Sequence, residues 1–208
     1  MSGFAGIVSA DGGAPDAKLI ERMAESLAFR GPDGTQFWRR AGAEFCFTLL
    51  RTGPSPQADS QPISLDGRVW LLGDVRLDGR EELLRKLEQH GENAASDATN
   101  EELILRAWRQ WAEDSFEILM GDFAFALWVA ETRQLWCVRD LLGGRPFFYA
   151  HAAGQFIFSN TLNVVRVAPK YRWSWTRVLL AIFYCNPGAP TWNAPRFGAC
   201  AGCRQAMR

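Results

Sequence analysis

The sequence has no excess of charge of either sign, because its 208 residues carry 23 Lys and Arg against 23 Asp and Glu. Proteins that bind nucleic acid or anionic membranes generally show a basic excess, so we expect neither as a partner. The longest uninterrupted apolar run, residues 178–185, is too short to cross a bilayer. No basic stretch followed by an apolar run opens the chain, so we expect a soluble, cytoplasmic protein.

Residues that bind metals are also scarce. The two histidines, His90 and His151, lie far in sequence from the single C-x-x-C pair, Cys200 and Cys203. Structural zinc sites need four such ligands, and the odd total of five cysteines does not suit a disulfide framework. No glycine-rich loop has the lysine spacing of a phosphate-binding loop. We therefore expect neither a metal nor a cofactor.

Apolar residues are plentiful: they make up 48% of the chain and include nine tryptophans, which indicates a packed core. Helical spacing of apolar residues predicts amphipathic helices over residues 19–27, 80–89 and 101–111. Several strand-like runs are apolar on both faces, as a sheet covered on both sides requires. These runs are residues 4–8, 45–50, 69–72, 123–128, 135–139, 147–149 and 156–158. The pattern predicts an α+β sandwich, with two sheets face to face and helices outside.

The first residues suggest chemistry as well as structure. Met1 precedes a small residue, so aminopeptidase trimming is expected to leave Ser2 as the N-terminal residue. A free α-amine has a pKa near ~8, so it can accept the proton of an adjacent hydroxyl and activate it as a nucleophile. The alternative interpretation is an ordinary translation start followed by a β-strand, with no catalytic role for Ser2.

A series of short motifs, in order along the chain, favours the first reading. They are Ser2-Gly3-Phe4-Ala5-Gly6-Ile7, Arg30-Gly31-Pro32-Asp33-Gly34, Leu50-Arg51, Gln61-Pro62, Gly73-Asp74, Gly121-Asp122-Phe123-Ala124-Phe125-Ala126-Leu127-Trp128, Arg139-Asp140-Leu141-Leu142-Gly143, Arg145-Pro146-Phe147-Phe148-Tyr149 and Phe158-Ser159-Asn160. Together they resemble the asparagine-synthetase-like class II glutamine amidotransferase domain. That resemblance implies the N-terminal-nucleophile hydrolase fold, a four-layer αββα sandwich.

The resemblance covers residues 1–168 and predicts two parts. Residues 1–168 form the glutamine amidotransferase type 2-like domain, and residues 169–208 form a tail of different composition. Asparagine-synthetase relatives continue into an ATP-dependent domain that carries a Ser-Gly-Gly-x-Asp-Ser run, which these 208 residues do not contain. We expect the tail to be either the start of a missing synthetase domain or aberrant sequence.

The resemblance also implies the catalytic residues. The family nucleophile is a cysteine, and Ser2 stands in its place. An asparagine side chain and a glycine N–H form the family's oxyanion hole, and they correspond to Leu72 and Gly73. Gly73 keeps its N–H, whereas Leu72 offers no donor.

The substrate anchor is matched in part. Arg51 corresponds to the arginine that holds the glutamine α-carboxylate, and Asp74 corresponds to the glutamate beside the oxyanion glycine. The family aspartate that holds the α-amine corresponds to Asn100, a neutral amide that cannot pair with an ammonium. Glu101 could replace it, but it is displaced by about 100° around a helix.

Three departures from the family pattern, at Ser2, Leu72 and Asn100, predict that glutamine hydrolysis is lost. The degenerate domains of lasso-peptide macrocyclases and β-lactam synthetases are the nearer resemblance. The expected role is as scaffold or partner of an ATP-dependent amide-forming domain or subunit. Two alternatives stay open: an active amidotransferase that binds glutamine and uses Ser2 as nucleophile, and a remnant without function.

Overall fold

Two antiparallel β-sheets packed face to face form the centre of the computed structural model, which describes residues 1–9, 11–40, 42–51, 60–152, 154–168 and 183–185. The first sheet has five strands in the order β2-β3-β1-β8-β7. Its strands are β1 (Gly3–Ser9), β2 (Gly34–Arg40), β3 (Ala43–Leu49), β7 (Phe148–Ala152) and β8 (Gln155–Ser159). β1 is therefore central, with β3 and β8 paired to its two edges.

The second sheet has four strands in the order β4-β5-β6-β9. They are β4 (Val69–Leu77), β5 (Gly121–Val129), β6 (Gln134–Arg139) and the short β9 (Phe183–Cys185). β9 pairs with Leu135, Trp136 and Cys137 of β6. The sequence placed residues 169–208 in a separate tail, but β9, which lies within that range, is a strand of this sheet.

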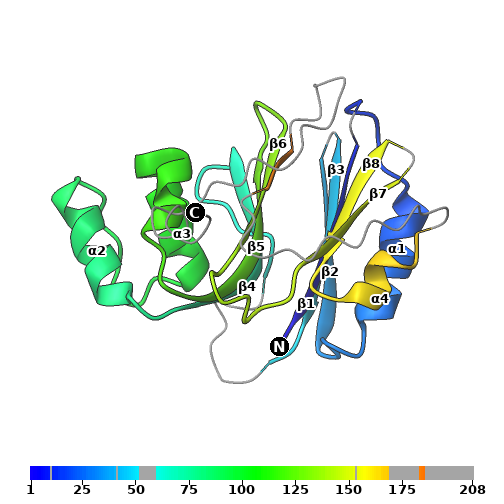
Figure 1. Ribbon diagram of the computed structural model, residues 1–208, viewed down its shortest axis with the longest axis horizontal. Helices are drawn as coiled ribbons and strands as arrows, with labels where there is room; N and C mark the ends of the chain where they lie inside the picture. Colours follow the sequence, from blue (N-terminus) through cyan, green and yellow to red (C-terminus); the bar gives the residue numbers. More distant parts are fainter. Residues whose placement is uncertain (10, 41, 52–59, 153, 169–182, 186–208) are drawn as a thin grey trace, which may run out of the picture.

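Helices cover the outer face of each sheet (Figure 1). α1 (Ala17–Leu27) and the short α4 (Leu162–Val165) lie on the five-stranded sheet, and their apolar side chains pack against those of β1, β3 and β8. α3 (Asn100–Trp111) and the 3₁₀ helix η2 (Ala112–Glu117) lie on the other sheet, and α2 (Arg80–Gln89) packs against α3 on the side away from the sheet. This arrangement confirms the predicted four-layer αββα sandwich.

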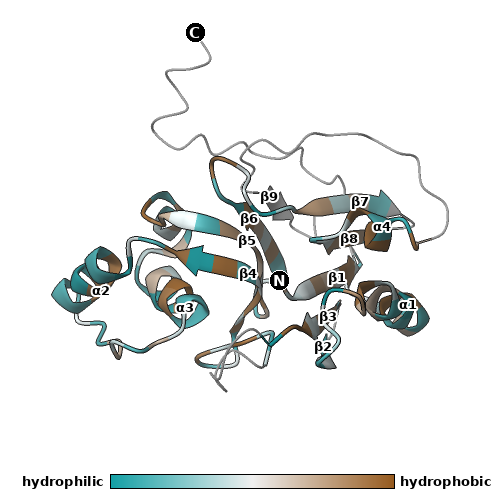
Figure 2. Ribbon diagram, turned by 90° about the horizontal axis from the view of Figure 1, so that it is seen from below, coloured by the Kyte–Doolittle hydropathy of each residue, from teal (hydrophilic) through white to brown (hydrophobic). Residues whose placement is uncertain are grey.

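α1, α2 and α3 form where the sequence predicted helices, and side chains cap the starts of α1 and α3. Asp16 caps α1 by accepting a hydrogen bond from the Lys18 N–H, and Thr99 and Glu102 form a capping box at the start of α3. In Figure 2, α2 is largely hydrophilic, in keeping with a helix that buries only Leu83 and Leu87. Among the described residues, no helix is long and apolar enough to span a membrane.

The core between the sheets is apolar and aromatic. Phe4, Phe45 and Phe158 project into it from the five-stranded sheet, and Leu72 and Trp128 project from the other. All of β1 and β3 is buried because the second face of this sheet is covered by α1. β2 was not predicted as a strand. It is an edge strand whose residues are mostly exposed, so it lacks a buried apolar pattern.

Candidate functional site

Ser2 lies immediately before β1 and is held by the ends of two other strands. Its Oγ accepts a hydrogen bond from the Leu50 N–H at 3.1 Å. Its carbonyl oxygen accepts one from the Asn160 Nδ2 at 3.0 Å, while the Asn160 Oδ1 accepts from the Phe4 N–H. Asn160 therefore fixes the course of the N-terminal segment, and Ser2 is in a defined position at the end of the five-stranded sheet.

Gly73 lies in the middle of β4, the edge strand of the other sheet. A Cβ at this position would come within 2.3 Å of the Phe125 Cβ on β5, so the close strand packing requires glycine. The Gly73 N–H donates to the Oε1 of Gln61 at 2.7 Å, and the Gln61 Nε2 donates to the Gly73 carbonyl at 3.0 Å. The N–H that the resemblance assigns to the oxyanion hole is thus already engaged.

Gln61 is the residue of this site that sequence reasoning missed as a functional candidate. It was visible only as part of the Gln61-Pro62 motif. Its backbone N–H donates to the Gln36 Oε1 on β2, and two residues later Ile63 forms a β-bridge with Leu71. Gln61 therefore connects β2 and β4, the edge strands of the two sheets. Its side-chain amide pairs with both the N–H and the carbonyl of Gly73, as the backbone of a neighbouring strand would.

Leu72 is fully buried between the sheets, where it joins the cluster that contains Phe4, Phe147 and Phe158. Its neighbour Leu71 is buried in the other cluster, beneath α3. The surroundings of Leu72 are apolar, so this position supplies packing and no hydrogen-bond donor.

Asn100 is the first residue of α3, and both ends of its amide have protein partners. Its Oδ1 accepts a hydrogen bond from the Arg80 guanidinium, and its Nδ2 donates to the Val75 carbonyl at 3.1 Å. The next residue, Glu101, lies beside the site instead: its Oε1 accepts from the Gln61 Nε2 at 3.3 Å. α3 thus brings Glu101, rather than Asn100, into contact with the Gln61–Gly73 pair.

Two carboxyl groups at this site have perturbed acidity. Burial raises the pKa of Asp74, and the charges of Arg145, the N-terminal amine and Arg30 oppose that rise. The Arg145 guanidinium is 3.4 Å from the Asp74 Oδ2. Burial also raises the pKa of Glu101, and the nearby charge of Asp74 adds to the effect. Asp74 and Glu101 therefore share a partly desolvated region.

Arg51 stands just after β3 and is exposed. Its backbone N–H donates to the Asp33 Oδ2 at 2.7 Å, which ties it to the Arg-Gly-Pro-Asp loop. The next residues, 52–59, are outside the described part of the chain. The structure therefore places the backbone of Arg51 near Ser2, through Leu50, and its role toward a substrate stays a prediction.

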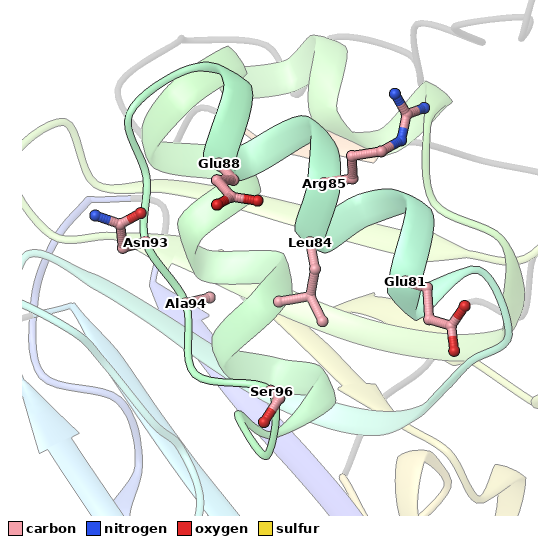
Figure 3. A pocket seen from close by; sticks show the side chains of 7 residues that line it. All are labelled: Glu81, Leu84, Arg85, Glu88, Asn93, Ala94 and Ser96. Carbon is pink, nitrogen blue, oxygen red and sulfur yellow. The ribbon is translucent and has the colours of Figure 1, made fainter.

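No group of three or more His, Cys, Asp or Glu side chains among the described residues could hold a metal ion. Cys200 and Cys203, where the sequence predicted no zinc site, lie outside the residues that the structure describes. A groove of about 380 Å³ lies between α2 and the segment 93–96, where Glu81, Leu84, Arg85 and Glu88 line one wall (Figure 3). None of the predicted site residues lines it.

Comparison with known proteins points to one family. A family model described as a glutamine amidotransferase domain matches residues 1–191. Asparagine synthetase [glutamine-hydrolyzing] 3 of Bacillus subtilis (strain 168) is 28% identical over 164 residues, which cover 74% of this chain and 25% of that protein. A putative asparagine synthetase [glutamine-hydrolyzing] of Mycobacterium tuberculosis (strain ATCC 25618 / H37Rv) is 32% identical over 159 residues, which cover 68% of this chain and 23% of that protein.

The fold is also shared with a solved structure. Glutamine phosphoribosylpyrophosphate amidotransferase from B. subtilis superposes with a TM-score of 0.64 at 16% identity, over 79% of this chain and 43% of that one. The chain spans about a quarter of the length of the curated relatives named above.

Proposed function

The chain belongs to the asparagine-synthetase-like class II glutamine amidotransferase domain family, and from this premise we propose that it no longer hydrolyses glutamine. Its proposed role is as scaffold or partner of an ATP-dependent amide-forming activity. The relatives are named for glutamine-dependent synthesis of asparagine. Because this chain spans only about a quarter of their length, the activity of the whole protein and its partners belong to the proposal.

The state of the oxyanion position carries this proposal. Acyl transfer from a carboxamide builds negative charge on the carbonyl oxygen, which donors must stabilise. Here the Gly73 N–H donates to Gln61, and Leu72 is an apolar residue sealed in the core. The loss of one donor typically costs about 2.7–4 kcal/mol, or ~10²–10³ in rate. Neither of the two family donors is free at this site.

The nucleophile and the substrate anchor weaken the case for hydrolysis further. A serine hydroxyl ionises far less readily than a cysteine thiol, whose pKa is about 8.5. Both amide groups of Asn100 are engaged by Arg80 and Val75, so this side chain has no group directed to a substrate ammonium. Each defect acts on a different part of the same reaction, so together they disfavour turnover.

A domain without ammonia production suits an amide-forming partner that uses another amine. In the lasso-cyclase type of reaction, a carboxylate is adenylated and an internal amine attacks it, so no glutamine is consumed. The second candidate, an active amidotransferase with Ser2 as nucleophile, rests on the defined position of the Ser2 hydroxyl. The third candidate is a remnant domain that has no function of its own.

Release of glutamate from glutamine tests the proposal. We expect no turnover by the wild type and little by Ser2→Cys, because the thiolate still lacks an oxyanion hole. The triple variant Ser2→Cys, Leu72→Asn, Asn100→Asp is expected to gain more than the sum of the single changes. Removal of Met1 is confirmed by mass spectrometry of each variant. Robust glutamine hydrolysis by the wild type would contradict the proposal.

The Leu72→Asn change carries a structural penalty, so each variant is first checked by thermal unfolding. An unsatisfied buried amide costs about 1–3 kcal/mol, and the lost apolar packing adds to this. Co-purification from the native host separates the scaffold role from the remnant. A stoichiometric adenylating partner supports the first, and a chain recovered alone supports the second.

A further inference from the structure

The groove of about 380 Å³ on the helical layer has one face of α2 as a wall (Figure 3). Glu81, Leu84 and Glu88 lie on this face, because residues three and four apart are neighbours on a helix surface. Arg85 also borders the groove, but in Figure 3 its side chain points to the opposite side of the helix from Leu84. The groove is therefore flanked by two carboxylates.

The opposite wall, residues 93–96, is held in place by arginines of α3. The Glu92 carboxylate accepts hydrogen bonds from the Arg109 Nε at 2.7 Å and from its Nη2 at 2.5 Å, a two-point contact that fixes direction as well as distance. The Arg106 Nη1 donates to the Asn93 carbonyl at 3.1 Å. Since α2 packs against the same helix, both walls are anchored on α3 and the groove exists before any ligand binds.

The groove combines an apolar floor with unpaired negative charge. Leu84 and Ala94 pack against the buried cluster beneath α3 and are still partly exposed. Glu82 pairs with Lys86 at 2.9 Å, whereas Glu81 and Glu88 are exposed and have no ion pair within the described part of the chain. Their seven-residue separation places them about 10 Å apart along the helix axis. Such a groove suits an apolar group with a cation beside it.

The sequence separates its charges between the domain and the residues that follow it. Residues 1–168 contain all 23 acidic side chains and 17 of the 23 basic ones. Residues 169–208 contain the remaining six basic side chains and no Asp or Glu. The domain is thus negative and the C-terminal range is positive, so the two parts attract each other although the whole chain is neutral.

The C-terminal range is also long enough to reach the groove. The described chain ends at β9, a strand of the sheet whose outer face carries α3. Residues 187–208 lie outside the described part and, as an extended chain, can span up to about 70 Å. They contain Trp192 and three arginines, and Arg196 stands directly before Phe197. This pair offers a cation next to a large apolar group.

We propose that residues 187–208 dock in the groove between α2 and residues 93–96. The Phe197 ring covers Leu84 and Ala94, and the Arg196 guanidinium pairs with one of the two groove carboxylates, a geometry that suits a guanidinium. The docking adds to the proposed function and does not depend on it, because none of the predicted site residues lines the groove.

Nuclear magnetic resonance of the full 208-residue chain tests the contact directly, with labelled leucine and alanine methyl groups. Leu84→Ile removes one leucine signal and so assigns it. We expect nuclear Overhauser effects between the Leu84 methyls and the Phe197 ring, and their loss with Phe197→Leu. No such effect in the wild type would overturn the proposal. A mixture of methyl-labelled and ring-labelled chains gives the signal only if the contact joins two copies, and that result would also overturn it.

Two further arms test the charge pairing. The double variant Glu81→Gln, Glu88→Gln is expected to weaken the Leu84–Phe197 effect at least twofold, as is 1 M sodium chloride, where the Debye length is about 3 Å. Glu25→Gln, at an exposed position on α1 in the other helical layer, is the matched control and leaves it unchanged. An undiminished effect in both arms, or an equal loss with Glu25→Gln, would contradict the proposal.

The wild-type measurement and Phe197→Leu still decide if the double variant fails to fold. Glutamate release is measured on the same samples, so failure of the proposed function is seen separately.

Discussion

At the scale of single residues, the site depends on how α3 orients consecutive side chains. Asn100 is turned to Arg80 and the Val75 carbonyl, whereas Glu101 is turned to Gln61. Successive residues of a helix differ by about 100° in direction, so neighbours in sequence reach different surroundings. The result is an acidic residue, Glu101, close to the Asp74 carboxylate.

The raised pKa of Glu101 makes stability depend on pH in a defined direction. The folded protein binds this proton more readily than the unfolded chain, so the group favours folding most below its unfolded pKa of about 4.3. That contribution is lost as pH rises through the elevated folded pKa. At neutral pH, above the unfolded pKa, burial of the Glu101 carboxyl therefore opposes folding.

We predict that Glu101→Gln raises the melting temperature at pH 7 and that the gain disappears as pH falls toward 4. The glutamine oxygen can still accept the hydrogen bond from Gln61, so the change removes charge and keeps the contact. Thermal unfolding across this pH range measures the effect, with the exposed Glu117→Gln as control. A gain of equal size at both ends of the range would contradict the burial argument.

At the scale of elements, the start of α3 decides which side chains reach the site. The Thr99 hydroxyl accepts a hydrogen bond from the Glu102 N–H at 3.1 Å, and the Glu102 carboxylate accepts from the Thr99 N–H at 3.1 Å. This capping box fixes where the helix begins. Asn100 and Glu101 are the first two residues after the cap, so its geometry sets their directions.

Thr99→Ala is expected to lower the free energy of unfolding by about 1 kcal/mol, within the usual range of ~0.5–2 kcal/mol for a lost N-cap. Thr99→Ser restores the hydroxyl and is expected to recover most of the loss. Ser96→Ala, at an exposed position in the preceding segment, serves as the control. Chemical denaturation measures all three, and a Thr99→Ala variant as stable as the control would show that the cap contributes nothing.

At the scale of the whole molecule, the sandwich is joined at the edges as well as in the core. Gln61 connects β2 and β4, which are edge strands of opposite sheets. On the other side of the second sheet, β9 pairs with β6 and covers its free edge. An uncovered edge exposes backbone groups that can pair with another chain.

Truncation tests the contribution of β9. A chain ending after Pro169 lacks this strand, and we expect its melting temperature to fall by several degrees, with increased aggregation. For a protein of this size a loss of 1 kcal/mol corresponds to about 2–4 °C. A chain ending after Asn186 keeps β9 and is the matched control. Equal melting temperatures for the two truncations would show that β9 adds no stability.

Local patterns in the sequence were sufficient for three of the helices, for most of the strands and for the fold class. The apolar spacing of Leu19, Ile20, Met23 and Leu27 correctly predicted α1, because helix periodicity is complete within a dozen residues. Runs apolar on both faces predicted sheets covered on two sides. The short motifs that begin at Ser2 identified the family. Each of these signals is contained in neighbouring residues, so no knowledge of distant contacts was needed.

Contacts between distant residues were decided only by the tertiary structure. β2 and β9 lack a clear strand pattern, because one is exposed at an edge and the other is very short. The engagement of Gly73 by Gln61 depends on a free strand edge, which exists only once the sheets have assembled. The sequence by itself determined which residues could act, and packing of the two sheets determined which of them are engaged by the protein.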